Sequence, residues 1–151
     1  MNYSIGIDLS LTGAGIIVLN FDGKIEEQEL LSTTPKEEIE NRIMFIGEKV
    51  ISIVNKYPNS EISIEGLSHG SASDSMLELA ALHYYVRILL KNQNLSFEVL
   101  PPTSLKKFLT GKGHAKKELM LLYVYKKYGE EFHDNNLADA YALARYGMRS
   151  K

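Results

Sequence analysis

The chain of 151 residues contains no cysteine, which excludes disulfide bonds and thiol chemistry and fits a reducing compartment. No apolar run approaches the roughly 18 residues that a transmembrane helix requires. The N-terminus also lacks the pattern of a signal peptide. These absences predict a cytoplasmic protein that has no membrane partner.

Length and composition predict one globular domain over residues 1–151, since 44% of the residues are hydrophobic and 24% are charged. The net charge of −2 argues by itself against a nucleic-acid partner, but the charges are unevenly distributed. Residues 22–40 are strongly acidic, whereas residues 101–128 contain one acid, Glu118, and seven lysines. These lysines are Lys106, Lys107, Lys112, Lys116, Lys117, Lys126 and Lys127. Such a region suits phosphate groups, although lysines on a solvated helix surface would give the same pattern.

Hydrophobic periodicity predicts an α/β fold with a mixed five-stranded sheet flanked by helices. The strands are expected at about 3–9, 15–20, 24–31, 61–65 and 97–100, and the helices at about 34–57, 74–92, 103–109, 115–128 and 135–148. Thr34 is expected to cap the first helix, with Pro35 at its first position. Strand–helix–strand connections predict parallel pairing of the first, fourth and fifth strands.

Two of the predicted parallel strands end on a carboxylate, Asp8 and Glu65. Ligands of such sheets bind beyond the carboxyl ends of the strands, so these two side chains should converge although they are 57 positions apart in the sequence. Taken singly, Asp8 could be a turn-capping residue and Glu65 a surface residue at a strand end.

The last predicted helix contributes Asp139, with Asn136 one turn earlier on the same helical face. Clustered carboxylates repel one another, and a hard cation with oxygen ligands stabilises them. The sequence therefore predicts a site for one or two Mg²⁺ ions, or Mn²⁺ in their place, with Asp8, Glu65, Asn136 and Asp139 as ligands. Two such ions would activate water and stabilise the leaving oxygen of a phosphodiester.

Four motifs resemble RuvC-type Holliday junction resolvases, in the same order from Ile5 to about Arg145. They are Gly6-Ile7-Asp8 followed by Ser10, Thr12-Gly13 and Gly15; Ile64-Glu65; the segment Lys106 to Lys117 with its Gly111-x-Gly113-x-Ala115-x-Lys117 spacing; and Ala138-Asp139-Ala140. The short chain and its divergent middle are similar to versions carried by bacteriophages.

The resemblance implies an RNase H-like fold, a homodimer, and divalent-metal-dependent hydrolysis of four-way-junction DNA in the cytoplasm of a bacterial host. It implies that Asp8 bridges the metal ions and that Glu65 and Asp139 complete their coordination. Lys106 and Lys117 match catalytic residues that contact the phosphate backbone or the transition state. Further DNA contacts are expected from Lys107, Lys112, Lys116 and His69.

The chain departs from the family at two places. Asn136 stands where an Asp or a His is usual, so metal affinity and cleavage rate should fall unless Asp134 or His133 compensates. A second hypothesis follows from this departure: a branched-DNA-binding protein with little or no cleavage activity. Residues 66–69 contain no aromatic wedge, which predicts looser selection of branched DNA.

Other features of the sequence allow alternative interpretations. The turn after Asp8 also resembles the phosphate hairpin of actin-like ATPases and sugar kinases, but those proteins need two such lobes and 151 residues supply one. Five tyrosines fall within predicted helices, which favours core packing or a dimer seam over base stacking. They are Tyr84, Tyr85, Tyr123, Tyr125 and Tyr128.

Overall fold

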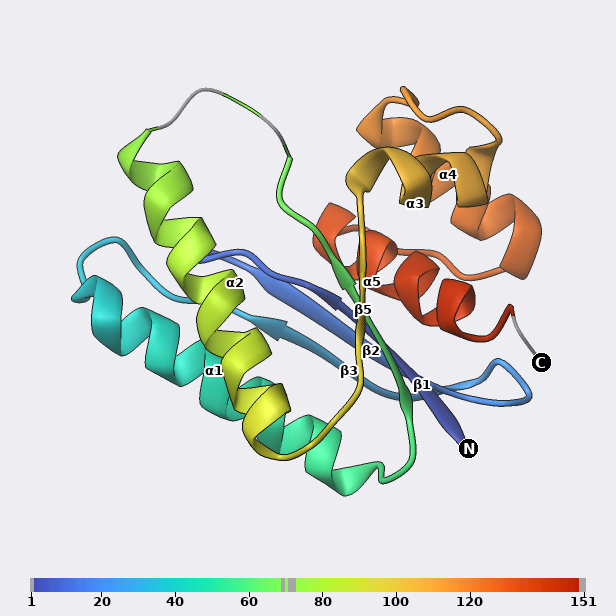
Figure 1. The fold of residues 1–151 in the computed structure, drawn as a ribbon. Coiled ribbons are helices and arrows are strands. Elements are labelled where there is room, and N and C mark those ends of the chain that lie inside the picture. The colour runs from blue at the N-terminus through green and yellow to red at the C-terminus, as the bar shows by residue number, and fades with distance from the viewer. Residues whose placement is uncertain (1, 69, 71–72, 150–151) are drawn as a thin grey trace.

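The computed structural model describes residues 2–68, 70 and 73–149, and Figure 1 shows their arrangement. The elements in chain order are β1 (Tyr3–Asp8), β2 (Ala14–Asn20), β3 (Ile25–Leu31), α1 (Ile39–Lys56), β4 (Glu61–Glu65), α2 (Asp74–Asn92), β5 (Glu98–Leu100), α3 (Pro102–Thr110), α4 (Lys117–Tyr128) and α5 (Asn135–Gly147). Across the described ranges, none of these helices is long and apolar enough to cross a bilayer.

The five strands form one mixed sheet in the order β3-β2-β1-β4-β5. β2 pairs antiparallel with β1 and with β3, whereas β4 pairs parallel with β1 and with β5. The predicted α/β class, the mixed sheet and the parallel pairing are confirmed. The acidic strand β3 lies at a sheet edge, where its charged side chains can remain in solvent.

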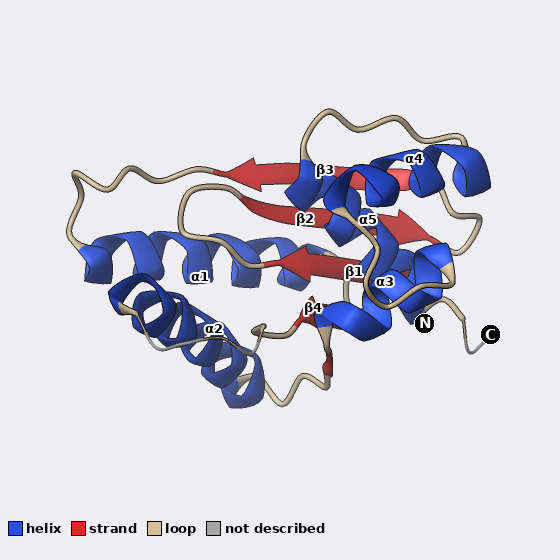
Figure 2. Cartoon of the chain, turned by 90° about the horizontal axis from the view of Figure 1, so that it is seen from above, coloured by secondary structure: helices blue, strands red, loops and turns tan. Residues whose placement is uncertain are grey.

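Helices cover both faces of the sheet, so each side chain of a strand points toward one of two helical layers (Figures 1 and 2). Side chains alternate along β1. Ile5 and Ile7 join the core beneath α1 and α2, whereas Ser4 donates a hydrogen bond to the carbonyl of Ala144 in α5 on the opposite face. Ser4 and Asp8 are separated by an even number of positions in β1, so their side chains lie on the same face of the sheet, the one that α5 covers.

Helix α5 lies directly against β1 and β2 because glycines and alanines line the contact. A Cβ atom at Gly6 would overlap the backbone of Ala140 and Ala144, and one at Gly15 would overlap the carbonyl of Asn136. The residues of α5 from Ala140 to Ala144 are completely buried. This close approach brings the first two turns of α5 to the carboxyl end of β1.

The predicted start of the first helix is wrong. α1 begins at Ile39 after Glu38, and no side chain caps it. Thr34 instead forms a separate turn, in which its carbonyl accepts a hydrogen bond from the amide of Glu37. The residue before a proline is disfavoured in helical conformation, which is compatible with such a turn ahead of the helix.

Candidate metal centre and nucleic-acid interface

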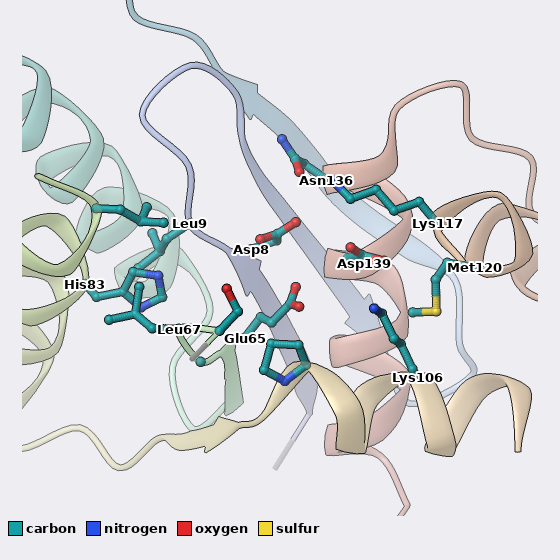
Figure 3. Close-up of a pocket in the computed structure, with 14 residues that line it drawn as sticks. Asp8, Leu9, Glu65, Leu67, His83, Lys106, Lys117, Met120, Asn136 and Asp139 are labelled. Atoms are coloured by element: carbon teal, nitrogen blue, oxygen red, sulfur yellow. The ribbon is translucent and has the colours of Figure 1, made fainter. Parts of the chain in front are cut away.

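Three carboxylates from distant parts of the sequence converge at the carboxyl ends of the central strands. Asp8 is the last residue of β1 and Glu65 the last of β4, and the parallel register that pairs Ile7 with Ile64 places them side by side. Asp139 approaches from the second turn of α5. One carboxylate oxygen from each residue lies within 4.8 Å of the others, and Figure 3 shows the three side chains facing one another. The predicted convergence is confirmed.

Burial and mutual repulsion make ionisation of this cluster costly. Burial raises the pKa of Asp8 well above its ordinary value, and the charges of Glu65 and Asp139 raise it further. Burial, with the charge of Asp139, raises the pKa of Glu65 to about 7. Burial also raises the pKa of Asp139 to about 6. The cluster therefore carries its negative charges at a cost in free energy unless a cation offsets them.

Two lysines oppose these pKa shifts. The positive charges of Lys106 and Lys117 lower the pKa of both Glu65 and Asp139, although burial outweighs them. Lys106 comes from α3 and Lys117 is the first residue of α4. Both line the same pocket of about 360 Å³ as the carboxylates (Figure 3). The pocket thus combines an acidic floor with cationic side chains that can face a phosphate.

The donor set fits a hard divalent cation. The carboxylate oxygens are nearly as close together as oxygens on one ion, which are separated by about 3–4 Å. The Oδ1 atom of Asp139 is buried and has no hydrogen-bond partner among the described residues. A buried hydrogen-bond acceptor without a partner costs free energy, and a cation that coordinates this oxygen would remove the cost.

Asn136 also lines the pocket, and its side chain is already engaged. Its amide nitrogen Nδ2 donates a hydrogen bond to the carbonyl of Gly13 in the loop between β1 and β2. Asp134 caps α5, since its carboxylate accepts hydrogen bonds from the amides of Asn136 and Leu137, and it is not among the residues that line the pocket. His133 is exposed and is not among the residues that line the pocket.

The remaining predicted DNA-contacting residues lie away from the carboxylates. Lys107, Lys112 and Lys116 are exposed and do not line the pocket. Lys112 and Lys116 instead border a separate open concavity in the segment between α3 and α4. His69 lies outside the described residues.

The sequence interpretation missed His83, a residue of α2 that also lines the pocket. It is only 2% exposed, and its Nδ1 has no hydrogen-bond partner in the described part of the chain. Burial and the nearby charge of Arg87 lower its pKa to about 4, so the imidazole is neutral near pH 7. No local pattern marks this position, because one histidine within a helix reads as an ordinary core residue.

Comparison with known proteins supports the family resemblance. A family profile described as "Crossover junction endodeoxyribonuclease RuvC" matches residues 4–145. A protein of that name from Rickettsia typhi is 33% identical over 124 residues, covering 80% of this chain and 78% of the relative. Another from Ehrlichia canis is 30% identical over 150 residues, covering 97% of this chain and 96% of the relative.

Solved structures agree with the fold. RuvC from Thermus thermophilus superimposes with a TM-score of 0.79 at 23% identity, covering 97% of this chain and 92% of that one. The same protein in complex with a Holliday junction substrate gives a TM-score of 0.83 at 22% identity, with coverage of 99% and 93%. The fold is RNase H-like, as the resemblance implied. From the sequence match and the fold together, this chain belongs to the RuvC family of crossover junction endodeoxyribonucleases.

Proposed function

We propose that this protein is a divalent-metal-dependent endonuclease that resolves Holliday junctions and related branched DNA by hydrolysing phosphodiester bonds. The observation that carries the proposal is the cluster of Asp8, Glu65 and Asp139, which lies beside two pocket lysines in a chain of this family. Clustered carboxylates that can hold a divalent metal, next to cationic side chains, can catalyse phosphodiester hydrolysis.

The residues divide into two roles. Asp8, Glu65 and Asp139 hold the metal, and Asn136 adds a neutral oxygen. A bound divalent ion supplies activation of the attacking water and stabilisation of the leaving oxygen. Lys106 and Lys117 face the phosphate and stabilise its developing charge, while the exposed lysines 107, 112 and 116 contact the DNA backbone further out.

The resident ion is Mg²⁺, replaceable by Mn²⁺, with one or two ions in each subunit, since small hard cations match an all-oxygen donor set. Residues 1–151 act as one nuclease domain. On the divergent middle of the sequence, we further propose a bacteriophage-encoded version that acts in the cytoplasm of a bacterial host.

Two symmetric cuts in a four-way junction require two active sites, so the proposed unit is a homodimer. Helix α2 carries an exposed apolar stripe formed by Leu77, Tyr84 and Ile88, whose side chains are 63%, 57% and 55% exposed. Their spacing of seven and four residues places them on one helical face. We propose that this stripe packs against the same stripe of a second copy, an isologous contact.

The direct test of the proposed function is cleavage of a labelled four-way junction with Mg²⁺ or Mn²⁺. The unmodified chain should cut it, and chelation should abolish cleavage. Asp8→Asn, Glu65→Gln and Asp139→Asn should each lower the rate by about 100-fold or more, since each removes an anionic ligand. Exposed Glu131→Gln is the matched control and should cut normally. Tight junction binding without any cleavage would favour the branched-DNA-binding alternative.

The raised pKa values predict how stability depends on pH without metal. Because the folded-state pKa values of Glu65 and Asp139 exceed their ordinary values, the folded state binds extra protons as the pH falls. The contribution of these carboxyl groups to the free energy of unfolding should therefore rise from about pH 8 to about pH 5, and His83, whose pKa is lowered, should oppose it below about pH 6.5. Asp139→Asn should raise the free energy of unfolding at about pH 8 by about 1–3 kcal/mol and flatten this dependence.

Urea unfolding at several pH values in the presence of a chelator measures this effect, with Glu131→Gln as the matched control. Mn²⁺ should raise the melting temperature of the unmodified protein at about pH 8, and less so at about pH 6, where protons compete with the ion. A metal-free stability that falls on acidification between about pH 8 and about pH 6 would contradict the account.

The phosphate-facing lysines predict a specific salt dependence of junction binding. In an Asp8→Asn background that prevents cleavage, Lys106→Ala and Lys117→Ala should each reduce the slope of log affinity against log salt by about one unit. Lys49→Ala, on α1 across the sheet, should leave the slope unchanged. Unaltered slopes for both pocket lysines would remove them from the proposed interface.

The dimer surface is tested by sedimentation equilibrium. Tyr84→Glu and Ile88→Glu should convert a dimer into a monomer, because each would bury unpaired charge in the proposed contact. Met44→Glu on α1, which replaces another exposed apolar side chain, should leave the dimer intact. A dimer that survives both α2 substitutions would place the interface elsewhere.

A further inference from the structure

The side chain of Asn136 connects the first turn of α5 to the loop that follows Asp8. Its Nδ2 donates to the carbonyl oxygen of Gly13, which is buried in the loop formed by residues 9–13. This orientation turns the amide oxygen toward the pocket. In Figure 3 that oxygen lies on the side of Asp8 and the nitrogen on the side away from it.

The loop that receives this hydrogen bond connects Asp8 to β2. On the side of α1 it is held at Leu11, whose carbonyl accepts hydrogen bonds from Thr33 and from the guanidinium of Arg42. On the side of α5 it is held at Gly13 by Asn136. The loop that follows Asp8 is therefore attached to both layers of helices.

A carboxylate cannot reproduce the contact to Gly13. An ionised Asp has no proton to donate, so one of its oxygens would face the carbonyl oxygen of Gly13 across a hydrogen-bond distance. It would also add a fourth negative charge beside three carboxylates whose ionisation is already costly. An Asn keeps the loop attached and leaves the charge of the site unchanged.

We infer that Asn136 is a positioning residue, which ties the loop after Asp8 to α5 and presents a fixed neutral oxygen to the metal. The amide donates a hydrogen bond to Gly13 that an ionised carboxylate could not donate, so Asn136 is more than a neutral substitute for an Asp. Its effect on metal binding rests on the proposed function, whereas its effect on the loop does not.

The test compares substitutions at Asn136 with substitutions at Asn135. Asn135 is the preceding residue in the first turn of α5 and is exposed, so its variants experience the same helix terminus. In chelator at about pH 8, Asn136→Ala should lower the melting temperature by about 3–8 °C, since it leaves the Gly13 carbonyl without a donor. Asn136→Asp should lower it by at least as much.

The matched variants Asn135→Ala and Asn135→Asp should change the melting temperature by about 2 °C or less, because only the weak interaction with the helix dipole changes. If Asn136→Asp were as stable as Asn135→Asp in chelator, the inference would be overturned. Asn136 would then be only a neutral substitute for an Asp at the metal site.

A second measurement separates positioning from stability alone. The Mn²⁺ concentration that gives half of the maximal thermal shift should rise several-fold in Asn136→Ala and stay unchanged in Asn135→Ala. An unaltered Mn²⁺ requirement in Asn136→Ala would overturn the positioning role. Neither measurement depends on DNA cleavage, so failure of the proposed endonuclease activity would be recognised separately.

Discussion

The structure depends on the direct contact between α5 and the sheet. Gly6 and Gly15 offer no side chain where the backbone of α5 passes, and the alanines of the helix fill the remaining space. A larger residue at Gly6 or Gly15 would displace the helix and move Asp139 away from Asp8. Close packing of small residues thus sets the geometry of a charged site whose three carboxylates stand on strands and a helix.

That packing creates an electrostatic conflict. Three carboxylates are held together and partly buried, so binding a proton or a cation at this point lowers the free energy of the folded protein. Lys106 and Lys117 relieve the conflict only in part and remain turned toward the pocket, where a phosphate can approach. Because the side chain of Asn136 is neutral, it adds no further negative charge to the cluster. The same arrangement that makes ionisation of the carboxylates costly suits a divalent ion beside a phosphodiester.

Much of the fold and the central cluster followed from the sequence because they depend on regular periodicity. Strand alternation and crossover connections place Asp8 and Glu65 at one sheet edge, and the spacing of α5 places Asn136 and Asp139 on one face. The start of α1 could not be predicted, because the capping signal at Thr34 serves a local turn. The hydrogen bond from Asn136 to Gly13 and the burial of His83 depend on tertiary packing, which no local pattern encodes.

The central claim is that Asp8, Glu65 and Asp139 bind one divalent-metal centre. A crystal structure of the protein soaked in Mn²⁺, with anomalous data collected near the manganese edge, tests it most directly. The account predicts an anomalous peak within about 2.0–2.4 Å of an oxygen from each of the three carboxylates. Well-ordered carboxylates without a peak between them, or a peak only at other residues, would contradict it.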